Sequence, residues 1–211
     1  MAEDKRSDIF DRWAENYDES VRGSTSFPFD GYDDVLDEVI RRAGVLEKRR
    51  VLDLGSGTGN LTERIVSAGG EAWALDFSEK MLARARRRLP DARFFQGDVL
   101  ADLPPLLKVP FDAVLSTYVF HEFPLMTKVS LLGRIAAEHL APGGRIVIGD
   151  VSFATTAERE RVLAEQADMA DDDEEYWAAT VAVPALESAG FRVDYTQVSS
   201  CGGVYVVHPN R

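Results

Sequence analysis

Apolar residues along the chain follow two spacings in turn, one typical of strands and one typical of helices. Short apolar runs predict strands within 49–55, 71–77, 92–98, 111–120 and 145–153. Between these runs, the helical spacing predicts helices that end near Ala68, Leu89 and Leu140. Strands that alternate with helices of this length predict a parallel sheet covered by helices on both faces. The predicted fold class is therefore α/β.

The two ends of the chain depart from this alternation. A first helix is predicted over 7–21, where one face carries Phe10, Trp13, Tyr17 and Val21. A second predicted helix begins at Tyr32 and stops at Gly44. After the last of the five strands, the chain has mostly helical propensity up to two β-like runs, 191–200 and 202–208. These runs are joined by a Cys-Gly-Gly turn and predict a hairpin that adds an antiparallel strand at the sheet edge.

The composition narrows the classes of protein to which this chain can belong. The chain has 211 residues, of which 45% are hydrophobic and 28% charged, and its net charge is −12. Such an acidic surface repels phosphate backbones, which disfavours a nucleic-acid substrate. The arginines between Arg84 and Arg88 are interpreted as a solvated helix face. No apolar run approaches the ~20 residues that cross a bilayer, so no membrane partner is expected.

Two further features concern the compartment and metals. The first residues lack the apolar core of a secretory signal, and the single cysteine, Cys201, excludes an internal disulfide. Together with the composition they favour a cytoplasmic protein. No cluster of His, Cys and carboxylates has metal-ligand spacing, so no metal site is predicted.

The clearest motif is the glycine turn VLDLGSGTGN at 51–60. It follows the first predicted strand, where open α/β sheets bind ligands. A phosphate loop would need a lysine that is missing, and a dinucleotide turn would have a glycine where Asn60 stands. Asp53, two residues before Gly55, would repel a pyrophosphate and suit an ammonium group. The turn therefore predicts a nucleoside ligand with a positive group and no phosphate.

The motif and its neighbours resemble a known family. The pattern Asp-x-Gly-x-Gly-x-Gly resembles motif I of the class I S-adenosylmethionine-dependent methyltransferases. The similarity continues in order through ALDFS, QGDVL, FDAVLSTYVFHEF and LAPGGRIVIGD, and covers roughly residues 8–150. The segments FDRWAENYD and STYVFHEF more narrowly resemble small bacterial methyltransferases of the YrrT-like and ubiquinone/menaquinone-biosynthesis type.

The resemblance implies a fold and a domain organisation. The fold is a Rossmann-like, seven-stranded, mostly parallel sheet with an antiparallel C-terminal hairpin strand. We expect one methyltransferase domain over 1–211. Its expected parts are a helical cap (1–44), a cofactor-binding core (45–150), a substrate-lid insertion (151–183), and a closing helix and hairpin (184–211).

The resemblance also implies the cofactor, S-adenosyl-L-methionine, and residues that bind it. Asp76 is expected to bind both ribose hydroxyls, and Asp98 to lie near the adenine amino group. Phe77 and Val99 follow these carboxylates and are positioned to sandwich the adenine, while Thr117 is expected at the methionine end. The full set of expected cofactor-binding residues is Asp53, Gly55, Ser56, Gly57, Thr58, Gly59, Asp76, Phe77, Met81, Asp98, Val99 and Thr117.

Two residues are candidates for catalysis. His121 follows the fourth strand, and its imidazole titrates near neutrality, so we expect it to act as a base or contact the acceptor; the alternative is a structural histidine. Tyr17 closes the site and excludes water, or its ring faces the sulfonium; the alternative is that it packs on the sheet. The acidic run 168–177 is either solvated charge at a helix N-terminus or a cation-selecting rim over the substrate pocket.

The sequence thus predicts an S-adenosylmethionine-dependent methyltransferase acting on a small-molecule acceptor, as a monomer or homodimer. One alternative is a non-catalytic S-adenosylmethionine-binding or partner-activating protein. A nicotinamide-dependent oxidoreductase is a weaker alternative, because Asn60 and Asp53 both disfavour it. The acceptor and its reacting atom are not predicted.

Overall fold

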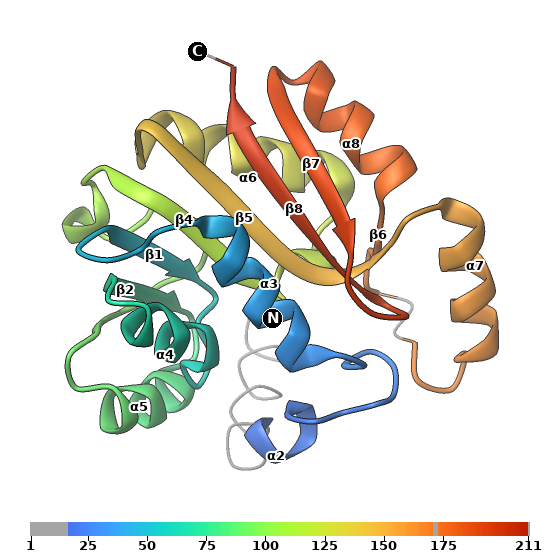
Figure 1. Cartoon of the computed structure of the whole chain (residues 1–211), viewed down its shortest axis with the longest axis horizontal. Coiled ribbons are helices and arrows are strands. Elements are labelled where there is room, and N and C mark those ends of the chain that lie inside the picture. The colour runs from blue at the N-terminus through green and yellow to red at the C-terminus, as the bar shows by residue number, and fades with distance from the viewer. Residues whose placement is uncertain (1–16, 171–172, 211) are drawn as a thin grey trace.

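A mixed β-sheet runs through the molecule (Figure 1). The computed structural model describes residues 17–170 and 173–210. In this part of the chain the strands lie in the order β3-β2-β1-β4-β5-β8-β7, and β6 pairs with β5 outside that path. Their bounds are β1 Arg50–Leu54, β2 Glu71–Asp76, β3 Arg93–Gln96, β4 Phe111–Thr117, β5 Leu140–Phe153, β6 Trp177–Ala178, β7 Phe191–Gln197 and β8 Gly202–Pro209.

The strand directions confirm the predicted fold class. β1 pairs in parallel with β2 and β4, and β3 and β5 extend the parallel sheet on either side. β8 is antiparallel to both β5 and β7, as the predicted hairpin requires. β5 begins at Leu140, earlier than predicted, because residues 141–144 form an irregularity within the strand and not a separate turn.

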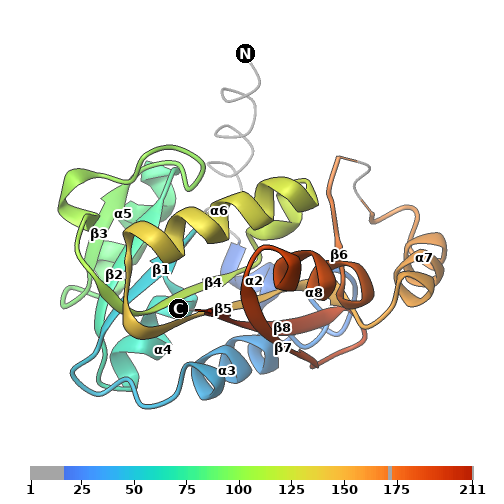
Figure 2. The ribbon, with the colours of Figure 1, turned by 90° about the horizontal axis from the view of Figure 1, so that it is seen from above.

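Helices cover both faces of the sheet (Figure 2). α3 (Tyr32–Ala43) and α4 (Asn60–Ser67) lie on one face, and α6 (Leu125–Glu138) and α8 (Ala179–Ser188) lie on the other. Val35, Leu36, Val39 and Ala43 of α3 are buried and contribute to the core on its side of the sheet. The remaining helices are α2 (Tyr17–Val21), α5 (Glu79–Arg88), α7 (Thr156–Glu165) and the short 3-10 turns η1 (Pro105–Leu107) and η2 (Phe120–Glu122). No helix in the described ranges is long and apolar enough to cross a membrane.

The arginine-rich face of α5 was predicted to be solvated, but two of its arginines contact other segments of the chain. Arg84 and Arg88 form ion pairs with Asp18 of α2, at 3.9 and 3.4 Å. Arg88 also donates to the carbonyl oxygen of Thr58, at 3.0 Å. These contacts join the N-terminal part of the chain to the glycine turn. The first predicted helix is described only from Tyr17, so Phe10 and Trp13 lie outside the described residues.

The segment just before β6 was also predicted to be helical, but its described residues do not form a helix. Tyr176 and Trp177 are buried, and Trp177 pairs with Ser152 of β5. The buried Lys128 of α6 donates to the carbonyl oxygen of Glu175 and lies 4.4 Å from the centre of the Trp177 ring. The described part of the acidic run therefore precedes a strand, so its interpretation as charge at a helix N-terminus is wrong.

Candidate active site

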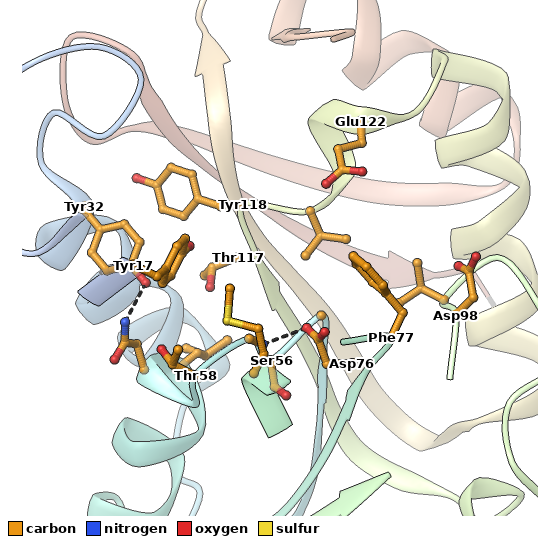
Figure 3. Close-up of a pocket in the computed structure, with 17 residues that line it drawn as sticks. Tyr17, Tyr32, Ser56, Thr58, Asp76, Phe77, Asp98, Thr117, Tyr118 and Glu122 are labelled. Carbon is orange, nitrogen blue, oxygen red and sulfur yellow. Dashed lines mark hydrogen bonds between the residues drawn. The ribbon is translucent and has the colours of Figure 1, made fainter. Parts of the chain in front are cut away.

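A cleft of about 690 Å³ lies at the carboxyl ends of β1, β2 and β4 (Figure 3). Figure 3 shows Tyr17, Tyr32 and Tyr118 on one side and Phe77 and Asp98 on the opposite side. All the expected cofactor-binding residues line this cleft except Asp53 and Gly59. The lining residues are Tyr17, Tyr32, Gly55, Ser56, Gly57, Thr58, Asn60, Leu61, Asp76, Phe77, Met81, Asp98, Val99, Thr117, Tyr118, Val119 and Glu122.

The glycine turn forms the floor of the cleft. The backbone amides of Gly55 and Ser56 both donate to the carbonyl oxygen of Leu75, at 2.8 and 3.0 Å, which ties the turn to β2. Gly55 has a φ of +71°, and a Cβ atom at this position would lie 2.2 Å from Cγ2 of Val119. Only glycine combines this backbone conformation with such a close approach.

Asp76 links the turn to the end of β2. Its side chain is buried, and its two oxygens accept from the backbone amides of Gly57 and Ser78, both at 2.8 Å. These bonds hold the carboxylate in one orientation beside the turn, and Figure 3 shows the one from Gly57. A carboxylate fixed in this way is suited to accept from two neighbouring hydroxyl groups of a ligand.

Asp53 does not reach the cleft, contrary to the expected contact with an ammonium group. Its side chain is fully buried and accepts from the Thr62 hydroxyl of α4, at 2.5 Å. Burial raises the pKa of Asp53 from 3.8 to about 7, and the charge of Asp76 adds to this effect. Asp53 therefore joins β1 to α4 beneath the turn, because its strand position points it into the core.

Because the Asp53 carboxyl group is buried, we expect the stability of the protein to depend on pH. A carboxyl whose pKa is raised on folding contributes stability below its unfolded value near 3.8, and this contribution is lost as the pH rises through about 7. We expect the free energy of unfolding of the wild type to fall relative to Asp53→Asn between pH 5 and pH 8, by about 2–3 kcal/mol. Denaturant titrations at several pH values measure the difference.

The control for that experiment is Asp91→Asn, which removes the same charge at an exposed position. Its difference from the wild type should stay nearly constant over the same pH range. Parallel curves for the wild type and Asp53→Asn would contradict a raised pKa at Asp53.

Gly59 also lies outside the cleft lining. It precedes α4 with a φ of +90°, and a Cβ atom there would lie 3.0 Å from Cδ1 of Leu89, just after α5. The third glycine of the motif therefore allows the two helices to approach closely. On the opposite wall, Asp98 accepts from the backbone amide of Leu100 at 2.8 Å, which shapes the loop that carries Val99.

Several tyrosines close one side of the cleft. The rings of Tyr32 and Tyr118 stack with their centres 5.0 Å apart. The hydroxyl of Tyr32 is hydrogen-bonded to the Tyr17 hydroxyl and accepts from the Asn60 amide. Burial raises the pKa of Tyr17 and Tyr118 well above the usual value. The structure thus places Tyr17 at the cleft and not simply against the sheet.

The sequence did not single out Tyr32, Asn60 or Glu122 as lining residues. Tyr32 was counted only as the start of a helix, and Asn60 only as a departure from the dinucleotide pattern. Their positions beside the glycine turn result from the packing of α3 against α4. Glu122 directly follows His121, and this adjacency was the available signal.

A second cavity of about 440 Å³ adjoins the cleft. The two cavities share Tyr17 and Tyr118 as lining residues. We call the second cavity the chamber, and define it by Tyr17, Pro28, Phe29, Tyr118, His121, Val151 and Glu174. His121 therefore lies in the chamber and not in the cleft itself.

His121 is held between two carboxylates. Its Nδ1 lies 2.6 Å from Oδ1 of Asp150, and its Nε2 lies 3.6 Å from Oε1 of Glu174. Burial alone would lower the pKa of His121, but the two carboxylates outweigh burial and raise it. The imidazole is oriented through Nδ1, while Nε2 faces Glu174.

Asp150 is a further residue that the sequence analysis missed. It is fully buried near the carboxyl end of β5 and also accepts from the backbone amide of His121, at 2.9 Å, and from the Trp177 indole, at 3.3 Å. The feature of the sequence that could have pointed to Asp150 is its position as an acid in an otherwise apolar strand next to β4. Asp150 connects the chamber to the segment that carries Glu174.

Comparison with known proteins identifies the family. The methyltransferase-domain family matches residues 51–144. A protein of Anoxybacillus flavithermus (strain DSM 21510 / WK1), described as an uncharacterized methyltransferase, is 33% identical over 91% of this chain and 92% of its own length. The chain belongs to the methyltransferase family. The matched segment contains the glycine turn, Asp76, Asp98 and His121.

Solved structures agree with this methyltransferase in fold. A DhpI complex with SAM and HEP has a TM-score of 0.74 at 22% identity, and the match covers 98% of this chain and 97% of that one. Magnesium protoporphyrin IX methyltransferase from Synechocystis PCC 6803 with bound SAH has a TM-score of 0.70 at 20% identity, covering 96% and 95%. The chain therefore shares its fold with these two proteins, one of which was solved with SAM and the other with SAH.

Proposed function

We propose that this methyltransferase binds S-adenosyl-L-methionine in the cleft and methylates a small molecule held in the chamber. The observation that carries the proposal is the shared wall of the two cavities. Tyr17 and Tyr118 line both, so a ligand in the cleft and a ligand in the chamber would both contact these two side chains. Holding two reactants in contact and in line is the main contribution that a protein makes to such a transfer.

The chemistry of the cleft fits this donor. Ser56 and Tyr118 each carry a buried hydroxyl oxygen without a partner in the described ranges, and both line the cleft. Asp76 offers a fixed carboxylate for vicinal hydroxyls. Neither Lys nor Arg is among the described residues that line the cleft, so a pyrophosphate would have no cationic partner. These features favour a nucleoside with a positive group over a nicotinamide dinucleotide.

The bound donor would supply a methyl group on a sulfonium, which needs only an acceptor lone pair in line with it. The chain's own residues then bind, orient and exclude water. Where the acceptor must lose a proton, His121 Nε2 is the chamber atom oriented to take it, because Asp150 holds Nδ1. The role of His121 as a base stays a prediction.

A small acceptor is supported by the size and walls of the chamber. Most of its lining side chains are aromatic or aliphatic, which is usual for small-molecule sites. The net charge of −12 works against a nucleic-acid acceptor. The similarity of the segments around Tyr17 and His121 to YrrT-like and ubiquinone/menaquinone-biosynthesis methyltransferases points the same way.

Calorimetric titration tests the proposal. S-adenosyl-L-homocysteine and S-adenosylmethionine should each bind the full chain at micromolar affinity, with one ligand per chain, and NADH should give no heat of binding. Binding of NADH with no binding of either adenosyl ligand would overturn the proposed function and favour an oxidoreductase.

A further inference from the structure

We propose that the chamber binds a small ligand through an ammonium group, and that Glu174 and the aromatic wall formed by Tyr17, Phe29 and Tyr118 select this cation. The inference rests on the proposed function and adds the chemical class of the acceptor. It is carried by the aromatic wall, by the sign of the charges and by the loose contact between Glu174 and His121.

The aromatic wall is suited to a cation. Phe29 lies next to Tyr118, with ring centres 5.6 Å apart and the planes inclined at 58°. Both rings line the chamber, as does Tyr17. A cation near ring faces is attracted by their negative charge density. Burial keeps the pKa of Tyr17 and Tyr118 raised, so both rings stay neutral phenols.

The fixed charges in the chamber are mainly negative. Glu174 lines the chamber and Asp150 lies behind it, whereas among the described lining residues there is no Lys or Arg. His121 is the one lining group there that can carry positive charge, and its Nδ1 already engages Asp150. A carboxylate or phosphate ligand would meet the Glu174 carboxylate, whereas an ammonium would pair with it.

The contact between Glu174 and His121 is open to exchange. The distance of 3.6 Å between His121 Nε2 and Glu174 Oε1 is too long for a good hydrogen bond. The Glu174 side chain is also 27% exposed, in contrast to the fully buried Asp150. An ammonium group that enters the chamber can therefore form an ion pair with the Glu174 carboxylate. Because Asp150 keeps Nδ1, His121 remains oriented toward the acceptor.

Two of the residues proposed to bind the cation lie in the chamber and not in the cleft. Phe29 and Glu174 line the chamber only. Recognition of the donor's own positive group would not require them. A test on protein saturated with S-adenosyl-L-homocysteine, which has no sulfonium, therefore isolates the chamber.

The experiment uses calorimetry on the full chain saturated with S-adenosyl-L-homocysteine. The probes are benzyltrimethylammonium, benzyl alcohol and phenylacetate, which share a phenyl ring and differ in charge. We expect the wild type to bind benzyltrimethylammonium at least tenfold more tightly than the other two. Glu174→Gln should lose at least tenfold in affinity for this cation. Glu175→Gln, an exposed neighbour with the same charge change, should stay within about twofold.

A second measurement does not depend on a bound probe. The pKa of His121, followed by NMR of the imidazole, should be lower in Glu174→Gln than in Glu175→Gln, because Glu174 is one of the carboxylates that raise it. Equal loss of cation affinity in the two variants, or preference for phenylacetate, would overturn the inference. Absence of S-adenosyl-L-homocysteine binding in the wild type would instead overturn the proposed function.

Discussion

Replacing Asp76 by alanine should weaken binding of S-adenosyl-L-homocysteine by roughly 100-fold or more. A charge-assisted hydrogen bond contributes about 1.5–3 kcal/mol, and Asp76 is placed to accept two from vicinal hydroxyls. The structure holds this carboxylate through the amides of Gly57 and Ser78, so no reorganisation is needed before a ligand binds. Calorimetric dissociation constants for the wild type and the variant measure the loss.

The matched control is Asp91→Ala, which removes the same charge from an exposed position. It should bind the ligand within about twofold of the wild type, because exposed single charges contribute little. Asp76→Asn keeps the size of the side chain and one acceptor oxygen, so its affinity should fall between those of the wild type and Asp76→Ala. Wild-type affinity in a folded Asp76→Ala protein would contradict the placement of the donor in the cleft.

Gly55→Ala should lower the melting temperature by about 5–15 °C. The left-handed backbone at Gly55 costs an L-residue about 1–2 kcal/mol, and the added methyl group would lie 2.2 Å from Cγ2 of Val119. Overpacking of this kind costs a further ~1–3 kcal/mol. For a chain of this length, each kcal/mol corresponds to about 2–4 °C. Thermal unfolding followed by circular dichroism measures the shift.

Gly57→Ala separates the two causes. Gly57 has a φ of +53°, but a Cβ atom there would meet nothing within 4 Å, so only backbone strain is added. Its melting temperature should fall by less than half as much. In a Val119→Ala background the cost of Gly55→Ala should shrink, because the clashing methyl group is removed. Equal effects of Gly55→Ala in both backgrounds would show that Val119 is not the cause.

The positions of the strands and of the glycine turn follow from local patterns. The apolar run at 50–54 and the glycines that follow predict a strand, a tight turn and a helix, since each signal lies within a few residues. The same holds for Asp76, because an acid at the end of a parallel strand lies at the edge where the ligand site forms. Gly55, Gly57 and Asp76 line the cleft, whereas Gly59 does not.

The direction of side chains and the pairing of distant segments are harder to predict from the sequence. Asp53 belongs to the same motif as Gly55, yet it points beneath the turn to Thr62, because strand side chains alternate between faces. The stretch around Trp177 forms a strand because β5 offers it a partner, although its local propensity is helical. Alternation gives the face of β1 on which Asp53 lies, but the partner on that face, and the pairing of the stretch around Trp177 with β5, depend on how separate elements pack.

The sequence by itself determined the α/β class, the turn that forms the cleft and the acid that stands beside it, because periodicity and motif spacing are local. Only the tertiary structure decided which groups face one another across the chamber. His121, Asp150 and Glu174 come from three separate segments and meet through the packing of β5 and β6. Their combined charge, which supports a cationic acceptor, exists only once those segments are packed together.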